Sequence, residues 1–326
     1  MNPDRPEPGA IVRAAAVLRA GGLVAFPTET VYGLGANALD SAAVRQIFDA
    51  KERPANNPLI VHVADLEAVR VVASEWPLVA DPLARRFWPG PLTLVLPRAA
   101  AVPDEVTAGG PTVAVRWPAH PVAQALIAAA GVPVAAPSAN RSSGVSPTRA
   151  EHVLRDLDGR IELILDGGAT PGGIESTVLD LTTAPPRLLR PGPIAPGQIE
   201  ALIGEVSLPS GTASRAPLPS PGMMARHYAP RARVELARDS GWELVRALSN
   251  GGRSVGWLAF APPAEPCPAS VKCLEMPSDA VAYARRLYAA LREVDESGVD
   301  CIVVALPPDA PEWLAVRDRL HRAAAK

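Results

Sequence analysis

The stretch Leu23–Leu59, LVAFPTETVYGLGANALDSAAVRQIFDAKERPANNPL, decides the fold of the first part of this chain. Its first four residues are apolar and are followed by turn residues, which predicts a short strand buried in a core. A helix is predicted next, because Asp40 and Ser41 form a start signal and apolar residues recur at positions 44, 47 and 48. A buried strand, a polar turn and an amphipathic helix in this order are typical of an α/β sheet.

Polar and charged residues flank these two elements. Thr28 and Thr30 follow the strand, and strand ends are where α/β sheets bind ligands. Lys51, Arg53 and two asparagines follow the helix on a proline-rich loop, so a small zwitterion could lie here beside a polyphosphate. The alternative interpretation is structural: Thr and Glu often form turns, and cations favour helix C-termini whatever the function.

Bulk composition restricts the class of protein. A length of 326 residues favours two domains, and 48% hydrophobic residues are enough for sizeable cores. The net charge of −2 argues against a surface built throughout for nucleic acid or anionic membrane. Any polyanion site must therefore be a local concentration of cations.

The cysteines and the termini indicate a compartment. The three cysteines form no CxxC pair, which predicts neither a disulfide framework nor a zinc site and fits a reducing cytosol. The N-terminus lacks the layout of a signal peptide, and the most apolar run, residues 125–137, is too short to span a bilayer. We expect a soluble, cytoplasmic protein with no membrane partner.

Three segments are predicted along the chain. Residues 1–204 alternate strands and helices with short links and form one α/β domain. Residues 205–231 are a Pro/Gly/Ser-rich linker that ends in apolar and cationic residues, so we interpret it as a lid over the first domain; simple packing is the alternative. Residues 232–326 predict a small doubly wound, Rossmann-like α/β domain without a GxGxxG fingerprint, whose role is structural or regulatory.

Polar residues recur in or at the ends of the predicted core strands of the first domain. If they meet in one cleft, their cations and those of the proline-rich loop supply enough positive charge for a nucleoside triphosphate. Six strands each contribute a hydroxyl, an amide, an imidazole or a cation, from Thr28 and Thr30, His62, Thr112 and Arg116, Ser138 and Asn140, Ser176 and Thr177, and Arg190.

The absence of several well-known motifs excludes some classes of reaction. The sequence contains no GxxxxGK[ST] loop, no GxSxG and no HExxH or His/Cys cluster, which excludes standard P-loop, acyl-enzyme and zinc chemistry. Glu29 and Glu175 are too few acids to hold a divalent ion, so magnesium would be held mainly by phosphate oxygens. Cations and hydroxyls without a nucleophile indicate transfer onto phosphorus by positioning and charge stabilisation.

Four motifs that occur in order along the first part of the chain are similar to those of a known family. They are PTETVYGLG at 27–35, KERP at 51–54 with NPL at 57–59, PSAN at 137–140 and ESTV at 175–178. Together they resemble the YrdC-type threonylcarbamoyl-AMP synthases, from about Ala10 to Gly204. The segment PGMMARHYAP at 221–230 and the α/β tail are similar to the long, two-domain branch of that family.

The resemblance implies a twisted mixed sheet with flanking helices and a specific reaction. Such enzymes join L-threonine, bicarbonate and ATP into threonylcarbamoyl-AMP and release pyrophosphate. The product passes to the machinery that modifies tRNA beside the anticodon, which leaves room for weak tRNA binding. Two rivals remain: a carbamoyltransferase module of the same fold from hydrogenase-maturation proteins, and a module that only binds RNA.

The resemblance also implies roles for individual residues. Lys51 and Arg53 would be catalytic, on a loop that we expect to be exposed, and Mg²⁺ would come with ATP and have no protein ligand. Glu52 stands where many relatives carry glycine and is expected to stiffen the loop. Threonine would be held by Thr30, His62, Arg116, Ser176 and the backbone of Ala136, and ATP by Lys51, Arg53, Asn57, Thr112, Ser138, Asn140, Ser146 and Arg190, with His227 and Tyr228 closing over the nucleotide.

Overall fold

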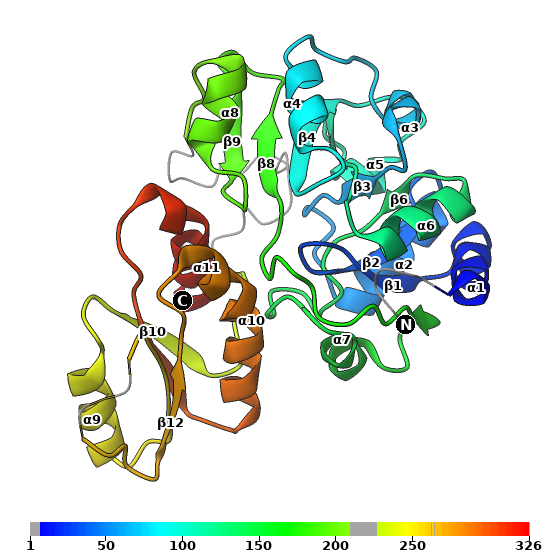
Figure 1. Ribbon diagram of the computed structural model, residues 1–326. Helices are drawn as coiled ribbons and strands as arrows, with labels where there is room; N and C mark the ends of the chain where they lie inside the picture. The colour runs from blue at the N-terminus through cyan, green and yellow to red at the C-terminus, as the bar shows by residue number, and fades with distance from the viewer. Residues whose placement is uncertain (1–6, 209–226, 262, 264, 326) are drawn as a thin grey trace. The chain divides into compact units, whose positions relative to one another are not determined.

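The computed structural model describes residues 7–208, 227–261, 263 and 265–325 (Figure 1). It divides into two compact units: the second holds Ser143–Ser146 together with the described chain after residue 226, and the first holds the remainder. Most of the predicted linker, residues 209–226, lies outside the described residues, and with it the predicted lid. Within the described ranges, none of the helices combines the length and apolarity needed to cross a bilayer.

In the described part of the first unit, nine strands form one mixed sheet in the order β7-β1-β2-β6-β3-β5-β4-β8-β9. Parallel and antiparallel pairs alternate irregularly, as in β3–β5 (parallel) and β4–β5 (antiparallel). The strands are β1 (Val24–Pro27), β2 (Tyr32–Asn37), β3 (Ile60–His62), β4 (Leu92–Pro97), β5 (Thr112–Arg116), β6 (Val134–Ala135), β7 (Leu163–Ile164), β8 (Thr177–Asp180) and β9 (Arg187–Arg190).

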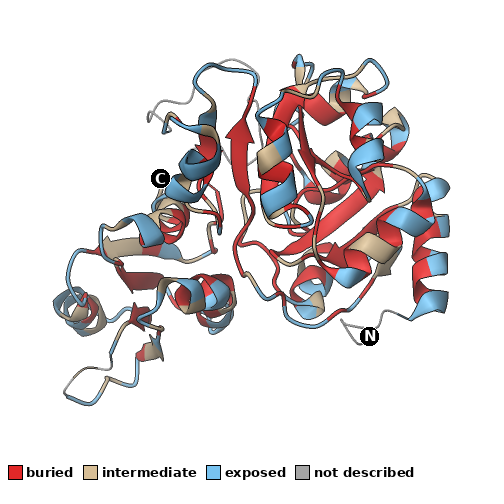
Figure 2. Cartoon of the chain, turned by 45° about the horizontal axis from the view of Figure 1, so that its top comes forward, coloured by how far each residue is buried: buried red, intermediate tan, exposed pale blue. Residues whose placement is uncertain are grey.

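Helices cover both faces of this sheet, so its strands are buried on both sides (Figure 2). In β1, Val24 and Phe26 belong to the core formed with α1 and α6, whereas Ala25 belongs to the core formed with α2. This alternation explains why β1 reads as a continuous apolar run. The helices are α1 (Pro8–Arg19), α2 (Ser41–Lys51), α3 (Leu66–Val72), α4 (Ala80–Phe87), α5 (Asp104–Thr107), α6 (Pro121–Ala130), α7 (Ala150–Leu157) and α8 (Pro196–Ile203).

Helix α2 begins and ends where local chemistry requires it to. The Asp40 carboxylate accepts hydrogen bonds from the amides of Ala42 and Ala43 and caps the N-terminus. Glu52 is the C-cap, with φ +53° and ψ +44°, a left-handed conformation that glycine adopts most easily. Glu52 holds this turn, and its carboxylate pairs with Arg160 at 2.9 Å.

The second unit contains a parallel sheet in the order β10-β13-β11-β12. The connection from β10 to β11 passes over the position of β13, and the connection from β12 to β13 returns in the opposite direction, as in a doubly wound fold. The predicted two-part α/β fold class is therefore confirmed. The elements are β10 (Arg233–Ala237), α9 (Trp242–Asn250), β11 (Val255–Ala259), β12 (Val271–Glu275), α10 (Ala280–Glu296), β13 (Cys301–Ala305), a 3₁₀ turn (Pro311–Trp313) and α11 (Leu314–Ala324).

Packing of α10 on β11 leaves no room for a side chain at Gly256. A Cβ atom there would lie 1.9 Å from Cγ1 of Val294, which is fully buried. Because valine is branched at Cβ, the contact cannot be relieved by a simple rotamer change.

We expect Gly256→Ala to lower the free energy of unfolding by about 1–3 kcal/mol, through overpacking of the helix–sheet contact. Urea denaturation measures the change. Gly197→Ala in α8 is the control, since a Cβ there meets no atom within 4 Å and alanine favours the helix. Equal effects of the two substitutions would contradict the packing argument.

Candidate active site

A tight turn presents the two threonines after β1. The hydroxyl of Thr28 donates to the carbonyl of Val31 at 2.7 Å and accepts from two amides, those of Thr30 and Val31. The Thr30 hydroxyl lies 2.8 Å from that of Thr28. Since the Thr28 proton is committed to Val31, Thr30 is the donor in this pair, and the turn fixes the direction of its hydroxyl.

Arg116 links this turn to the sheet. Its guanidinium donates to Thr30 Oγ1 at 3.0 Å, to Glu29 Oε1 at 2.6 Å and to the carbonyl of Gly90 at 3.3 Å. The second oxygen of Glu29 accepts from the amide of Ala119 at 3.0 Å. Arg116 is only 3% exposed, so its charge is neutralised locally by Glu29. These contacts use three of its five N–H donors, which leaves two donors for a ligand.

Strand register places more of the predicted residues beside Arg116. His62 is paired directly with Arg116 across β3 and β5, so both side chains project on the same face. Leu94 pairs with Val115, which brings Thr93 opposite Arg116 on β4. Neighbouring strands lie about 4.8 Å apart, so His62, Arg116 and Thr93 form one short row across the sheet.

The row continues to Ser176, immediately before β8. Its hydroxyl lies 2.8 Å from that of Thr93 and accepts from Arg190 Nη2 at 3.0 Å, while Arg190 Nε donates to the Ser176 carbonyl. All three residues are at most 3% exposed. The structure thus brings together Thr30, His62, Arg116, Ser176 and Arg190 of the predicted set.

The imidazole of His62 is held neutral. Burial lowers the pKa of His62 to about 3, and the positive charge of Arg116 adds to this effect. Its ring packs edge-on against Phe26, with centroids 6.3 Å apart. Its Nδ1 atom has no hydrogen-bond partner among the described residues, so a buried polar atom is available to a ligand.

Lys51 occupies a different environment from the one predicted. It is the last residue of α2 and 1% exposed, so the expectation of an exposed loop is wrong. Its ammonium donates to the carbonyls of Ser138 and Asn140, and burial followed by the charge of Arg53 lowers the pKa of Lys51 well below its usual value. Lys51 lies on the same buried face of α2 as the apolar residues Val44 and Ile47. An interpretation based on the charged residues alone overlooks this.

Arg53 is also buried, at 8% exposure, again contrary to expectation. It donates to the carbonyls of Asn57 at 3.0 Å and Pro58 at 2.8 Å and closes its own loop. Lys51, Arg53, Asn57, Ser138 and Asn140 thus form a second cluster. Pro58 lies four residues before His62, or about 13 Å along an extended strand, so β3 connects this cluster to the row.

The remaining predicted residues have other surroundings. Thr112 is the first residue of β5 and Arg116 the last, so Thr112 lies at the other end of the strand from the row. Ala136 connects to β3 through its amide, which donates to the carbonyl of Ile60. Ser146, His227 and Tyr228 belong to the second unit, where the Tyr228 ring stacks on Tyr288 at 5.7 Å.

Sequence reasoning missed Thr93 and underrated Glu29. Thr93 is a fully buried residue of β4, and the available sequence signal was a hydroxyl residue inside the apolar run LTLVLP. Glu29 was considered only as a metal ligand, yet both its oxygens are engaged by Arg116 and the Ala119 amide. Among the described residues, no group of three or more His, Cys, Asp or Glu side chains could hold a metal ion.

Comparison with known proteins relates this geometry to a family. Residues 16–192 match the family model described as "Telomere recombination" (Sua5/YciO/YrdC), and residues 194–325 match "Threonylcarbamoyl-AMP synthase, C-terminal domain". The chain is 46% identical to the threonylcarbamoyl-AMP synthase of Pyrococcus abyssi, over 98% of this chain and 95% of that protein. It is 48% identical to the Bacillus subtilis enzyme of the same name, over 96% and 92%.

A solved structure is similar over both units. Pyrococcus abyssi Sua5, crystallised in complex with L-threonine, is 47% identical and superposes with a TM-score of 0.91, covering 98% of this chain and 95% of that one. Another structure of the same protein carries a His/Tyr double substitution to alanine and also has a TM-score of 0.91.

We expect Lys51→Ala to destabilise the protein by at least about 2 kcal/mol, because two carbonyls lose a charged donor inside the structure. Chemical denaturation measures the loss. Arg45→Ala is the control on the same helix: Arg45 is 59% exposed and pairs with Glu105 on the surface, so it should cost at most about 1 kcal/mol. Similar costs for both variants would show that the Lys51 contacts contribute little.

Stability should depend on pH through His62. In the unfolded chain the imidazole gains a proton near pH 6.5, whereas in the folded protein it stays neutral down to about pH 3. The unfolded state therefore binds more protons in this window, and stability falls as pH is lowered through it. Denaturation of the wild type and of His62→Gln between pH 7 and pH 4 tests this, with a shallower decline expected for the variant; parallel curves would refute it.

Proposed function

The chain belongs to the threonylcarbamoyl-AMP synthase family, and on that premise we propose that it makes L-threonylcarbamoyl-AMP from L-threonine, bicarbonate and ATP. The observation that carries the proposal is the buried row of His62, Arg116 and Ser176, with Thr30 hydrogen-bonded to Arg116. Pyrophosphate and water are the other products.

The row fits the groups of threonine. The two remaining N–H donors of Arg116 could bond to a carboxylate, and Glu29, Thr30 and Gly90 hold the guanidinium in place. The unpartnered Nδ1 of His62 offers a hydrogen bond to the substrate hydroxyl. Because His62 is neutral at physiological pH, it adds no positive charge that would compete with Arg116.

The cations suit the triphosphate. Arg190 supplies positive charge beside Ser176, and Arg53 supplies it on the loop before β3. Lys51 holds the loop 138–140 through its carbonyl contacts. The threonine amine would take up bicarbonate to give a carbamate and water. The carbamate oxygen would then attack the α-phosphorus while pyrophosphate leaves, with the protein acting by positioning and charge stabilisation.

Magnesium would enter with ATP. The chain's nearest candidate ligand, Glu29, already balances Arg116, so phosphate oxygens and water would hold the ion. When bound, Mg²⁺ would neutralise the charge that develops on the departing pyrophosphate.

We further propose that the product is handed to the machinery that modifies tRNA, which would place the reaction in the cytoplasm. Threonylcarbamoyl-AMP is a mixed anhydride of a carbamate and a phosphate, so an acyl-accepting reaction must consume it. The net charge of −2 is compatible with only weak direct binding of tRNA.

Pyrophosphate release from ATP tests the proposal, with threonine and bicarbonate omitted in turn. We expect dependence on both; release that depends on neither would refute it. Arg116→Lys should raise KM for threonine at least about tenfold and KM for ATP much less, because lysine lacks the bidentate fork. Arg187→Lys, on the exposed end of β9, is the matched control and should leave both constants unchanged.

A further inference from the structure

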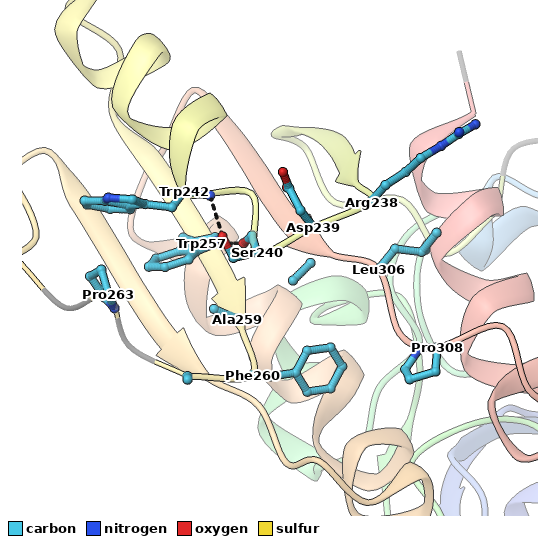
Figure 3. Close-up of a pocket in the computed structure, with 12 residues that line it drawn as sticks. Arg238, Asp239, Ser240, Trp242, Trp257, Ala259, Phe260, Pro263, Leu306 and Pro308 are labelled. Carbon is cyan, nitrogen blue, oxygen red and sulfur yellow. Dashed lines mark hydrogen bonds between the residues drawn. The ribbon is translucent and has the colours of Figure 1, made fainter.

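The second unit contains a cavity of about 630 Å³ that the proposed synthesis does not use (Figure 3). It opens at the carboxyl ends of three strands: Arg238 follows β10, Phe260 follows β11 and Leu306 follows β13. Its volume falls within the range of about 300–1,000 Å³ common for small-molecule sites.

The strand order of this sheet predicts a ligand site at the same place as the cavity. Helix α9, which follows β10, packs on one face of the sheet, where Val245 meets Ala237 and Trp257. Helix α10 covers the other face through Val294, and α11, which follows β13, packs beside α10. The chain therefore leaves the adjacent strands β10 and β13 toward opposite faces, and open α/β sheets bind ligands in the crevice that this arrangement creates.

The walls of the cavity are flat and apolar. Trp257 is 1% exposed, and its ring lies 5.1 Å from that of Trp242. Phe260 lies across the hollow, beside Leu306 and Pro308 (Figure 3). Its ring is held by Tyr283 and Trp313, with centroids 5.6 and 5.9 Å away. Fixed aromatic faces of this kind favour a planar aromatic ligand.

The loop between β10 and α9 is unsuited to phosphate. Asp239 Oδ1 accepts from the Gly241 amide at 2.9 Å, and Ser240 Oγ accepts from the Trp242 amide at 3.3 Å. The amides of the N-cap residue Gly241 and of Trp242, the first residue of α9, are thus occupied by side chains. The guanidinium of Arg238 extends away from the hollow, whereas the carboxylate of Asp239 stands at its rim (Figure 3).

This loop is rigid enough to define a site. Gly241 has φ +77°, and a Cβ there would lie 2.9 Å from Val303 Cγ1 and 3.0 Å from Ala237 Cβ. Trp257 Nε1 donates to the carbonyl of Ser240 at 2.8 Å. The Gly241 amide bonds to Oδ1 of Asp239, and this contact holds the carboxylate while its second oxygen can act as an acceptor.

We propose that this cavity binds an uncharged nucleoside. The base would lie against the half-buried rings of Phe260 and Trp242, and the ribose hydroxyls would donate to the Asp239 carboxylate, an acceptor that two neighbouring hydroxyls can share. A nucleotide fits less well, because its phosphate would meet the negative charge of the Asp239 carboxylate. An amino acid fits less well because its carboxylate would have no cation inside the hollow.

Calorimetric titration of the full chain with adenosine tests the proposal. We expect binding that persists in Arg190→Ala, that weakens about tenfold in Asp239→Asn, the loss typical of one hydrogen bond to a charged group, and that is tighter than binding of AMP to the same Arg190→Ala protein. Asparagine can still cap the Gly241 amide, so this variant should fold. Glu243→Gln is the matched control, an exposed acid in the first turn of α9 that does not line the cavity.

Three results would overturn the proposal: no adenosine binding, binding that Arg190→Ala abolishes, or equal affinities of Asp239→Asn and Glu243→Gln. Leu306→Trp, which fills the hollow, gives a second measure, and binding at full strength by this folded variant would also overturn it. Adenosine binding is measured without turnover, so its failure leaves the pyrophosphate assay unaffected, and failure of that assay leaves this site untouched.

Discussion

The first unit depends on how a buried positive charge is compensated at Arg116. A guanidinium that is 3% exposed would be very costly without a partner, and Glu29 supplies one at 2.6 Å. The same contact ties the turn after β1 to the end of β5, two segments almost ninety residues apart. Because other N–H donors of Arg116 are left over, one interaction both closes the fold and leaves donors for the carboxylate that we propose binds here.

Two more buried basic residues, Lys51 and Arg53, connect loops near the start of β3. Lys51 joins the end of α2 to the loop 138–140, and Arg53 holds the loop that follows α2. Both groups bond to backbone carbonyls, which carry only partial negative charge. The guanidinium of Arg53 supplies positive charge here, which suits the triphosphate proposed to bind. Structural and catalytic roles are hard to separate for such residues.

The two sheets bring side chains together in different ways, one through strand direction and the other through strand order. In the mixed sheet, the row of side chains arises because β5 is parallel to β3 and antiparallel to β4, so a carboxyl end meets an amino end. In the parallel sheet, the hollow arises because β10 and β13 send the chain to opposite faces. The first arrangement gathers cations and hydroxyls, whereas the second gathers tryptophan and phenylalanine around one carboxylate.

The sequence by itself determined the two α/β parts, the strand at residues 23–26, the start of α2 and the residue types of the site, because these follow from local periodicity, capping and composition. Only the tertiary structure decided that Lys51 and Arg53 are buried, that Thr93 joins Ser176, and that Thr112 lies at the far end of β5 from Arg116. Burial and partnership are set by strand order and register between segments distant in sequence, and no local pattern of residues encodes those.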